Sequence, residues 1–158
     1  MTGVQTCALP ILLGDTVTGE ASEVAKVYAA LVREIRAHQQ PFRTPVALIS
    51  GGECTVTVRG NGRGGRCAEF LTSLAVELDG MPDVYALAAD TDGIDGTEDN
   101  AGALLLPDSP ARAAAQGLTA KQLLSNNDGY SYFEALGDLL VTGPTRTNVN
   151  DYRVILVL

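Results

Sequence analysis

Apolar residues recur along most of the chain at spacings typical of helices or strands. Between Gly19 and Ala37 they return with helical periodicity, which predicts an amphipathic helix capped by Thr18. The polar residues 126–128 are expected to cap a later helix. We expect helices over 19–37, 66–80, 110–116, 119–125 and 129–136, and strands over 46–50, 55–59, 84–89, 138–141 and 153–158.

These elements predict an α/β protein with a layered, mixed β-sheet of about five strands flanked by helices. The run over 84–89 is apolar throughout, so we expect that strand to be buried on both faces. A chain of 158 residues is long enough for one well-packed core and short for two. We therefore expect a single domain.

Composition limits the classes of function. The net charge is −8 and the pI is about 4.5, so we expect no binding to nucleic acid and no basic membrane-binding surface. The three cysteines form no C-x-x-C pair, which is typical of a reducing compartment and indicates the cytoplasm. Residues 1–11 fit poorly with the rest of the chain, so we expect a non-native or disordered leader there and one domain over 12–158.

The Gly-rich stretch over 60–65 carries the strongest chemical signal. It holds four glycines in six residues, between a predicted strand and a predicted helix. Glycines allow backbone N–H groups to approach an anion, and the first turn of a helix adds unpaired donors. Arg63 and Arg66 add fixed positive charge. We expect this stretch, including Gly64 and Gly65, to bind a phosphate or a carboxylate.

Five acidic residues follow the apolar strand that ends near Ala89. Their spacing is similar to that of a calcium-binding EF-hand loop, but the required glycine and the final glutamate are missing, so that motif is rejected. One or two carboxylates that hold Mg²⁺ together with substrate phosphates fit the pattern better. The candidate metal ligands are Asp92 and Asp95, each of which is followed by a glycine within one residue.

Two more segments are candidates for the same site. Gly51 and Gly52 are expected to form a turn, either a plain hairpin or a turn that faces a ligand beside Glu53. Glu53 or Asp92 is a candidate base for a hydroxyl proton. A Gly-Pro turn near the C-terminus carries more hydrogen-bonding groups than a plain turn needs, and its candidate binding residues are Thr142, Gly143, Thr145 and Asn148.

Three long motifs occur in order: ISGGECTVTVRGNGRGGRCAEF, ALAADTDGIDGTEDNAG and NNDGYSYFEALGDLLVTGPTRTNVND. Together they closely resemble the C-terminal MOFRL domain of class II glycerate 2-kinases, a family also named hydroxypyruvate reductase. The resemblance extends from about Leu12 to the end of the chain. It implies a reaction that uses ATP and Mg²⁺ to phosphorylate the 2-hydroxyl of D-glycerate or a related hydroxy acid. The implied active site is a cleft between this domain and a larger N-terminal α/β domain.

The resemblance also implies roles for particular residues. It places Arg66 in the active site and lines the cleft with the segment Ser50–Glu53 and with the loop around Asp92 and Asp95. The segment over 142–151 forms another wall. The catalytic lysine of the family lies in the N-terminal domain, which these 158 residues lack, so we expect this chain to fold but to have no activity by itself. A homodimer is left open.

Two departures from the family pattern and two rival functions remain. Cys67 and Ala68 replace an expected Asn-Gln pair, and Arg146 replaces a small residue.

The G-x-G-x-x-G pattern over 60–65 matches a dinucleotide fingerprint, so an NAD(P)H-dependent hydroxypyruvate reductase is the first rival function. The neighbouring arginines and the lack of an acidic residue about 20 positions further on disfavour it. A non-catalytic anion-binding module is the second rival.

Overall fold

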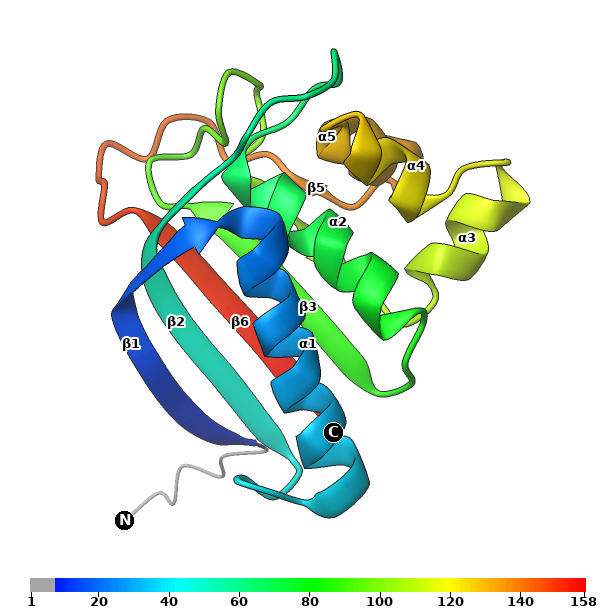
Figure 1. Ribbon diagram of the computed structural model, residues 1–158. Helices are drawn as coiled ribbons and strands as arrows, with labels where there is room; N and C mark the ends of the chain where they lie inside the picture. Colours follow the sequence, from blue (N-terminus) through cyan, green and yellow to red (C-terminus); the bar gives the residue numbers. More distant parts are fainter. Residues whose placement is uncertain (1–7) are drawn as a thin grey trace.

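The computed structural model describes residues 8–158. Within them, six strands form one mixed sheet in the order β1-β2-β6-β3-β4-β5 (Figure 1). β1 and β2 are parallel, and the other neighbouring pairs are antiparallel. The predicted α/β class is confirmed, although β1 and β4 were not predicted. The strands are β1 (Leu9–Glu20), β2 (Val46–Thr55), β3 (Val84–Asp90), β4 (Gly102–Leu105), β5 (Leu139–Leu140) and β6 (Asp151–Val157).

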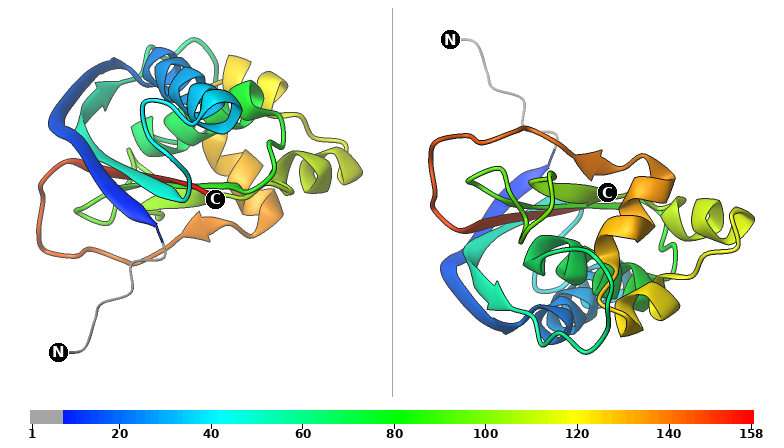
Figure 2. Two further views of the ribbon diagram at one scale, coloured as in Figure 1. Left: turned by 90° about the horizontal axis from the view of Figure 1, so that it is seen from below. Right: turned by 90° about the horizontal axis from the view of Figure 1, so that it is seen from above.

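The helices of the described residues agree closely with the predicted ranges. They are α1 (Ala21–His38), α2 (Arg66–Leu78), α3 (Ser109–Ala115), α4 (Ala120–Ser125) and α5 (Gly129–Leu136). α1 and α2 lie side by side on one face of the sheet, and α4 and α5 pack against α2 (Figures 1 and 2). None of these helices is long and apolar enough to span a membrane. The core between helices and sheet includes Tyr28, Val32, Ile35, Leu48, Phe70, Leu71, Leu74 and Ile155.

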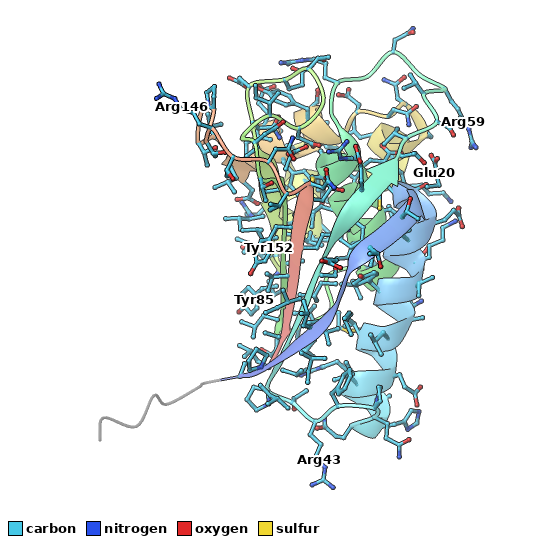
Figure 3. All side chains as sticks on the ribbon, turned by 90° about the vertical axis from the view of Figure 1, so that its left-hand side faces the viewer. Glu20, Arg43, Arg59, Tyr85, Arg146 and Tyr152 are labelled. Atoms are coloured by element: carbon cyan, nitrogen blue, oxygen red, sulfur yellow. The ribbon has the colours of Figure 1, made fainter. Side chains whose placement is uncertain are left out.

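The opposite face of the sheet is less well covered. Tyr85 of β3 is 38% exposed and Tyr152 of β6 is 43% exposed. Both side chains lie on the side of the sheet away from α1 (Figure 3). The prediction that the strand over 84–89 is buried on both faces is therefore wrong. A run of apolar residues does not by itself show whether a second layer covers the sheet.

The start of the chain differs most from the prediction. β1 runs from Leu9 to Glu20, so Thr18 lies in a strand and does not cap α1. Within the expected leader, residues 9–11 pair with Val46–Leu48 of β2, and residues 1–7 lie outside the described part of the chain. Glycines and polar residues interrupt the apolar pattern of β1, and for this reason its sequence did not indicate a strand.

β2 extends the predicted strand over 46–50 to Thr55 and contains no turn at Gly51 and Gly52, contrary to the prediction. The predicted strand over 55–59 is wrong, because residues 56–59 form a loop after β2. Gly52 has a φ of +119°, and a Cβ atom there would lie 2.2 Å from the carbonyl oxygen of Val17. The pairing of β1 with β2 shifts in register between Gly14 and Val17. Gly52 thus permits the close approach of an irregular neighbouring strand, which is a common role of glycine inside a sheet.

Candidate functional site

Three loops meet at one end of the strands β2, β3 and β6 (Figure 1). The Gly-rich loop over 56–65 leaves β2, the acidic loop over 91–101 leaves β3, and the loop over 141–150 enters β6. β6 is antiparallel to both β2 and β3, so its first residue, Asp151, lies beside Gly52 on one side and Asp90 on the other. The sheet topology therefore brings the predicted segments together.

Arg66, the first residue of α2, joins these segments. Its Nε donates to Asp151 Oδ1 at 2.5 Å, and its Nη2 donates to Asp90 Oδ2 at 2.6 Å. Its Nη1 donates to Glu53 Oε1 at 3.1 Å. Partial burial opposes the charged form, but the three carboxylates outweigh this effect and raise the pKa of Arg66. Arg66 is thus a permanent cation with a fixed orientation.

A second arginine, Arg153 of β6, lies beneath this cluster. It is 1% exposed and donates to Asp151 Oδ2 and, at 3.0 Å, to Cys54 Sγ. The buried Asp151 carboxylate therefore bridges Arg66 and Arg153. The sequence analysis included Asp90 in the acidic cluster and Asp151 in the segment over 142–151, but it gave neither an individual role, and it gave Arg153 none. For Arg153, the one available signal was a charged residue at an inward position of an apolar strand.

A cavity of about 620 Å³ lies beside Arg66. Within residues 8–158, the N–H groups of Gly64, Gly65 and Arg66 have no protein acceptor. Three successive backbone N–H groups without a protein acceptor, next to the guanidinium of Arg66, suit an anion, because the backbone donors are not already occupied. The polar and glycine residues that line the cavity are Thr18, Glu53, Thr55, Gly62, Gly64, Gly65, Arg66, Glu69, Gly96 and Asn127.

The rest of the Gly-rich loop does not present free donors. The five successive N–H groups of residues 59–63 all donate to residues 126–128. A Cβ atom at Gly60 or Gly62 would lie only 2.3 Å or 2.4 Å from that segment. These glycines therefore allow the loop backbone to pack closely against residues 126–128. The predicted capping role of these residues is wrong, since no side-chain hydrogen bond caps α5.

Arg63 does not join Arg66 at the cavity. Its Nη2 donates to Glu98 Oε2 at 2.7 Å, and its guanidinium lies 4.0 Å from the centre of the Tyr130 ring. These contacts direct the side chain toward the acidic loop and α5, and Arg63 is not among the residues that line the cavity. The expectation that the two arginines act at one spot is therefore wrong.

Asp95 serves α2 directly. It is fully buried, and its two carboxylate oxygens accept the N–H groups of Cys67 at 2.9 Å and Ala68 at 2.8 Å. Burial raises the pKa of Asp95 to about 6, although the two N–H groups act to lower it. Asp95 is thus the anion at the N-terminus of α2. A metal ion at Asp95 would compete with both hydrogen bonds, which disfavours the predicted ligand role.

Asp92 is more accessible, and the C-terminal loop surrounds it. Asn148 Nδ2 lies 3.4 Å from Asp92 Oδ2, and the N–H group of Thr145 donates to the Asp92 carbonyl at 2.9 Å. A Cβ atom at Gly93 would lie 2.2 Å from the Gly143 carbonyl oxygen. The predicted binding residues of this loop are therefore gathered around Asp92, two residues beyond the partner of Arg66.

The remaining candidates lie apart from the cavity. Ser50 is buried, and its hydroxyl accepts a hydrogen bond from Tyr28 at 2.7 Å, so it packs beneath α1. The hydroxyl of Thr142 donates to the carbonyl of the next residue. Arg146 is exposed and points away from the sheet (Figure 3). Within the described residues, no group of three or more His, Cys, Asp or Glu side chains is arranged to hold a metal ion.

Comparison with known proteins finds relatives named hydroxypyruvate reductase or glycerate kinase. A protein of Agrobacterium vitis provisionally named hydroxypyruvate reductase is 50% identical over 150 residues, which are 94% of this chain and 34% of that protein. D-glycerate 2-kinase of Thermotoga maritima is 41% identical over 139 residues, 88% of this chain and 33% of the kinase. The solved structure of a T. maritima glycerate kinase matches with a TM-score of 0.92 at 38% identity, covering 96% of this chain and 36% of that one.

The extent of these matches identifies the family. The chain spans about a third of the length of the A. vitis and T. maritima relatives named above. The profile of the MOFRL family matches residues 46–151, which include Arg66, its three carboxylate partners and the Gly-rich loop. The chain therefore belongs to the MOFRL family.

Proposed function

We propose that this chain is the C-terminal domain of an ATP-dependent glycerate 2-kinase of the cytoplasm. The whole enzyme would phosphorylate the 2-hydroxyl of D-glycerate, or of a related hydroxy acid, and form 2-phosphoglycerate in the first case. Relatives named glycerate 2-kinase, at 41% and 33% identity, support this reaction. The buried free thiols of Cys54 and Cys67 fit a reducing compartment. The observation that carries the proposal is Arg66 beside three free N–H groups on the cavity wall.

Phosphoryl transfer depends on positioning and on positive groups around the phosphate oxygens. Arg66 and the N–H groups of Gly64 and Gly65 would supply these donors. Glu53 has a 58% exposed side chain, against 6% for Asp90 and less for Asp151, so an arriving anionic group would displace Glu53 from Arg66 most easily. The released Glu53 carboxylate is then the candidate base for the substrate hydroxyl.

Mg²⁺ would neutralise charge on the phosphates when it is bound. It commonly takes one or two carboxylates and completes its coordination with phosphate oxygens and water, so a three-ligand protein cluster is not required. We place it at Asp92 because both oxygens of Asp95 accept helix N–H groups. Gly51, Thr142, Gly143, Thr145 and Asn148 are proposed to form the neighbouring cleft surface.

The test uses this chain joined to the N-terminal two thirds of its A. vitis relative. We expect Arg66→Ala to lower kcat/KM for D-glycerate about 10²-fold or more, because transition-state charge stabilisation is lost. Arg43→Ala is the matched control, since Arg43 is exposed at the opposite end of the molecule (Figure 3). ADP formation is the measurement. A value for Arg66→Ala within a few-fold of the parent would contradict the proposal.

The two alternative functions, a hydroxypyruvate reductase and a non-catalytic anion-binding module, predict different binding results. Titration of the joined protein with NADH and with Mg-ATP separates the reductase from the kinase, and binding of NADH alone would indicate the reductase. That alternative is not favoured, because the loop donors that would meet a dinucleotide are bonded to residues 126–128. Binding of glycerate without any turnover would indicate an anion-binding module. Light scattering on the same protein tests a homodimer.

A further inference from the structure

Asn127 lies where the Gly-rich loop, α2 and the connection between α4 and α5 meet. Its Oδ1 accepts the N–H groups of Arg59 at 2.7 Å and Gly60 at 3.1 Å. Its Nδ2 donates to Glu69 Oε1 at 3.1 Å and to the Thr57 carbonyl at 3.4 Å. One amide side chain thus binds two parts of the loop and connects them to α2.

The two residues next in sequence extend this contact along the loop. Asn126 accepts the N–H group of Asn61 through its side chain at 3.1 Å and that of Gly62 through its carbonyl at 2.9 Å. Asp128 accepts the N–H group of Arg63 at 3.0 Å. Three successive residues therefore hold five successive loop residues, a set of contacts that helix capping does not explain.

The backbone on both sides is shaped for this contact. A Cβ atom at Gly60 would lie 2.3 Å from the Asn126 carbonyl oxygen, and one at Gly62 would lie 2.4 Å from Asp128 Cβ. Asn127 has a φ of +53°, a left-handed conformation that asparagine tolerates better than most residues. The glycines of the loop and the asparagine opposite them are thus complementary.

The anchored residues lead directly into Gly64, Gly65 and Arg66, which line the cavity together with Asn127. We infer that Asn127 is a positioning residue, which ties the Gly-rich loop to α2 through Glu69 and thereby holds the loop's free N–H groups and Arg66 toward the cavity. The inference rests on the kinase function proposed for that wall. It assigns Asn127 an indirect role, because the residue acts through the loop backbone.

Exchanging the two paired side chains tests this role. Asn127→Asp keeps an acceptor for the loop N–H groups, removes the donor to Glu69 and places two carboxylates side by side. Glu69→Gln alone is the matched control, because an amide there still offers an oxygen to Asn127. In the double variant N127D/E69Q, the amide at position 69 can donate to the carboxylate at position 127. The hydrogen bond is then restored with its direction reversed.

The first measurement is amide hydrogen exchange on the 158-residue chain at pH 8. The N–H groups of Arg59 and Gly60 should exchange about tenfold faster in Asn127→Asp, because the side chain at position 127 loses the hydrogen bond to Glu69 that holds it against the loop. Their rates should return to near the parent values in the double variant. Glu69→Gln should change these rates less than Asn127→Asp does. The amides of α1 serve as an internal control for intact folding.

The second measurement is kcat/KM for D-glycerate in the joined enzyme. It should fall about tenfold in Asn127→Asp and recover in the double variant, a rescue that general destabilisation would not produce. If the double variant behaves like Asn127→Asp, or if Asn127→Asp equals the parent in both measurements, the inference is overturned. A parent enzyme that forms no ADP with D-glycerate would instead refute the kinase proposal, and exchange alone would then decide whether Asn127 holds the loop.

Discussion

Three carboxylates contact Arg66, which together carry more negative charge than the arginines beside them neutralise. Arg66 and Arg153 supply two positive charges, whereas Glu53, Asp90 and Asp151 supply three negative ones. A cluster with excess negative charge attracts a free anion weakly. The balance improves when the exposed Glu53 moves away or when a cation accompanies the anion. The charge count therefore favours metal-bound phosphate over free phosphate as the ligand.

Glu69 provides a prediction for pH dependence. It is 5% exposed, and burial raises its pKa from 4.5 to about 7; Asn127 and Arg59 oppose this rise, and Glu20 and Asp95 add to it. Since the folded state then binds the proton more tightly than the unfolded state, stability falls as the pH rises from about 4.5 to about 7. We expect Glu69→Gln to flatten this part of the profile of unfolding free energy, measured with urea. An unchanged slope would refute the assignment.

At the scale of elements, prediction succeeds where the signal is local. The ranges of α2 and α5 follow from apolar spacing and from the glycines near their ends, and the structure reproduces both ranges to within two residues. β2 was misjudged because Gly51 and Gly52 indicate a turn in most sequences, and β1 was missed because its own glycines and polar residues interrupt the apolar pattern. The irregular neighbour that requires a glycine in mid-strand lies 35 residues earlier in the chain, at Val17.

Gly52 and Gly117 allow a matched test of that close approach. Both have positive φ, but a Cβ atom at Gly117 meets open space, whereas one at Gly52 would meet the Val17 backbone at 2.2 Å. We expect Gly117→Ala to cost about 1 kcal/mol of unfolding free energy from backbone strain alone. Gly52→Ala should cost at least about 2 kcal/mol, because β1 must also move. Urea denaturation measures both, and equal losses would argue against the contact.

At the scale of the whole molecule, the cavity is incomplete for the proposed reaction. Arg66 is the single cation among the residues of the described chain that line it. Both lysines of the sequence, Lys26 and Lys121, line a separate groove. Since phosphoryl transfer needs several positive groups around the phosphates, the proposed reaction predicts that further groups come from outside this chain.

This incompleteness leads to a prediction about activity. The 158-residue chain should form no glycerate-dependent ADP by itself, whereas the chain joined to the N-terminal two thirds of its A. vitis relative should do so. A coupled assay for ADP with and without D-glycerate is the measurement, and the joined protein with Arg66→Ala is its control. Turnover by the isolated chain would show that this domain contains a complete active site.

The sequence by itself determined the α/β class, most helix boundaries and the family, and it singled out Arg66, which the structure places against three carboxylates. Periodicity and ordered motifs are local properties, so they can be read along the chain. Only the tertiary structure decided which donors remain free. Asn127 accepts from Arg59, 68 residues earlier, and Asp95 accepts from Cys67, 28 residues earlier. A hydrogen bond satisfied by a distant segment leaves no mark near the donor, and the Gly-rich stretch therefore suggested a wider anion site than the three N–H groups that remain.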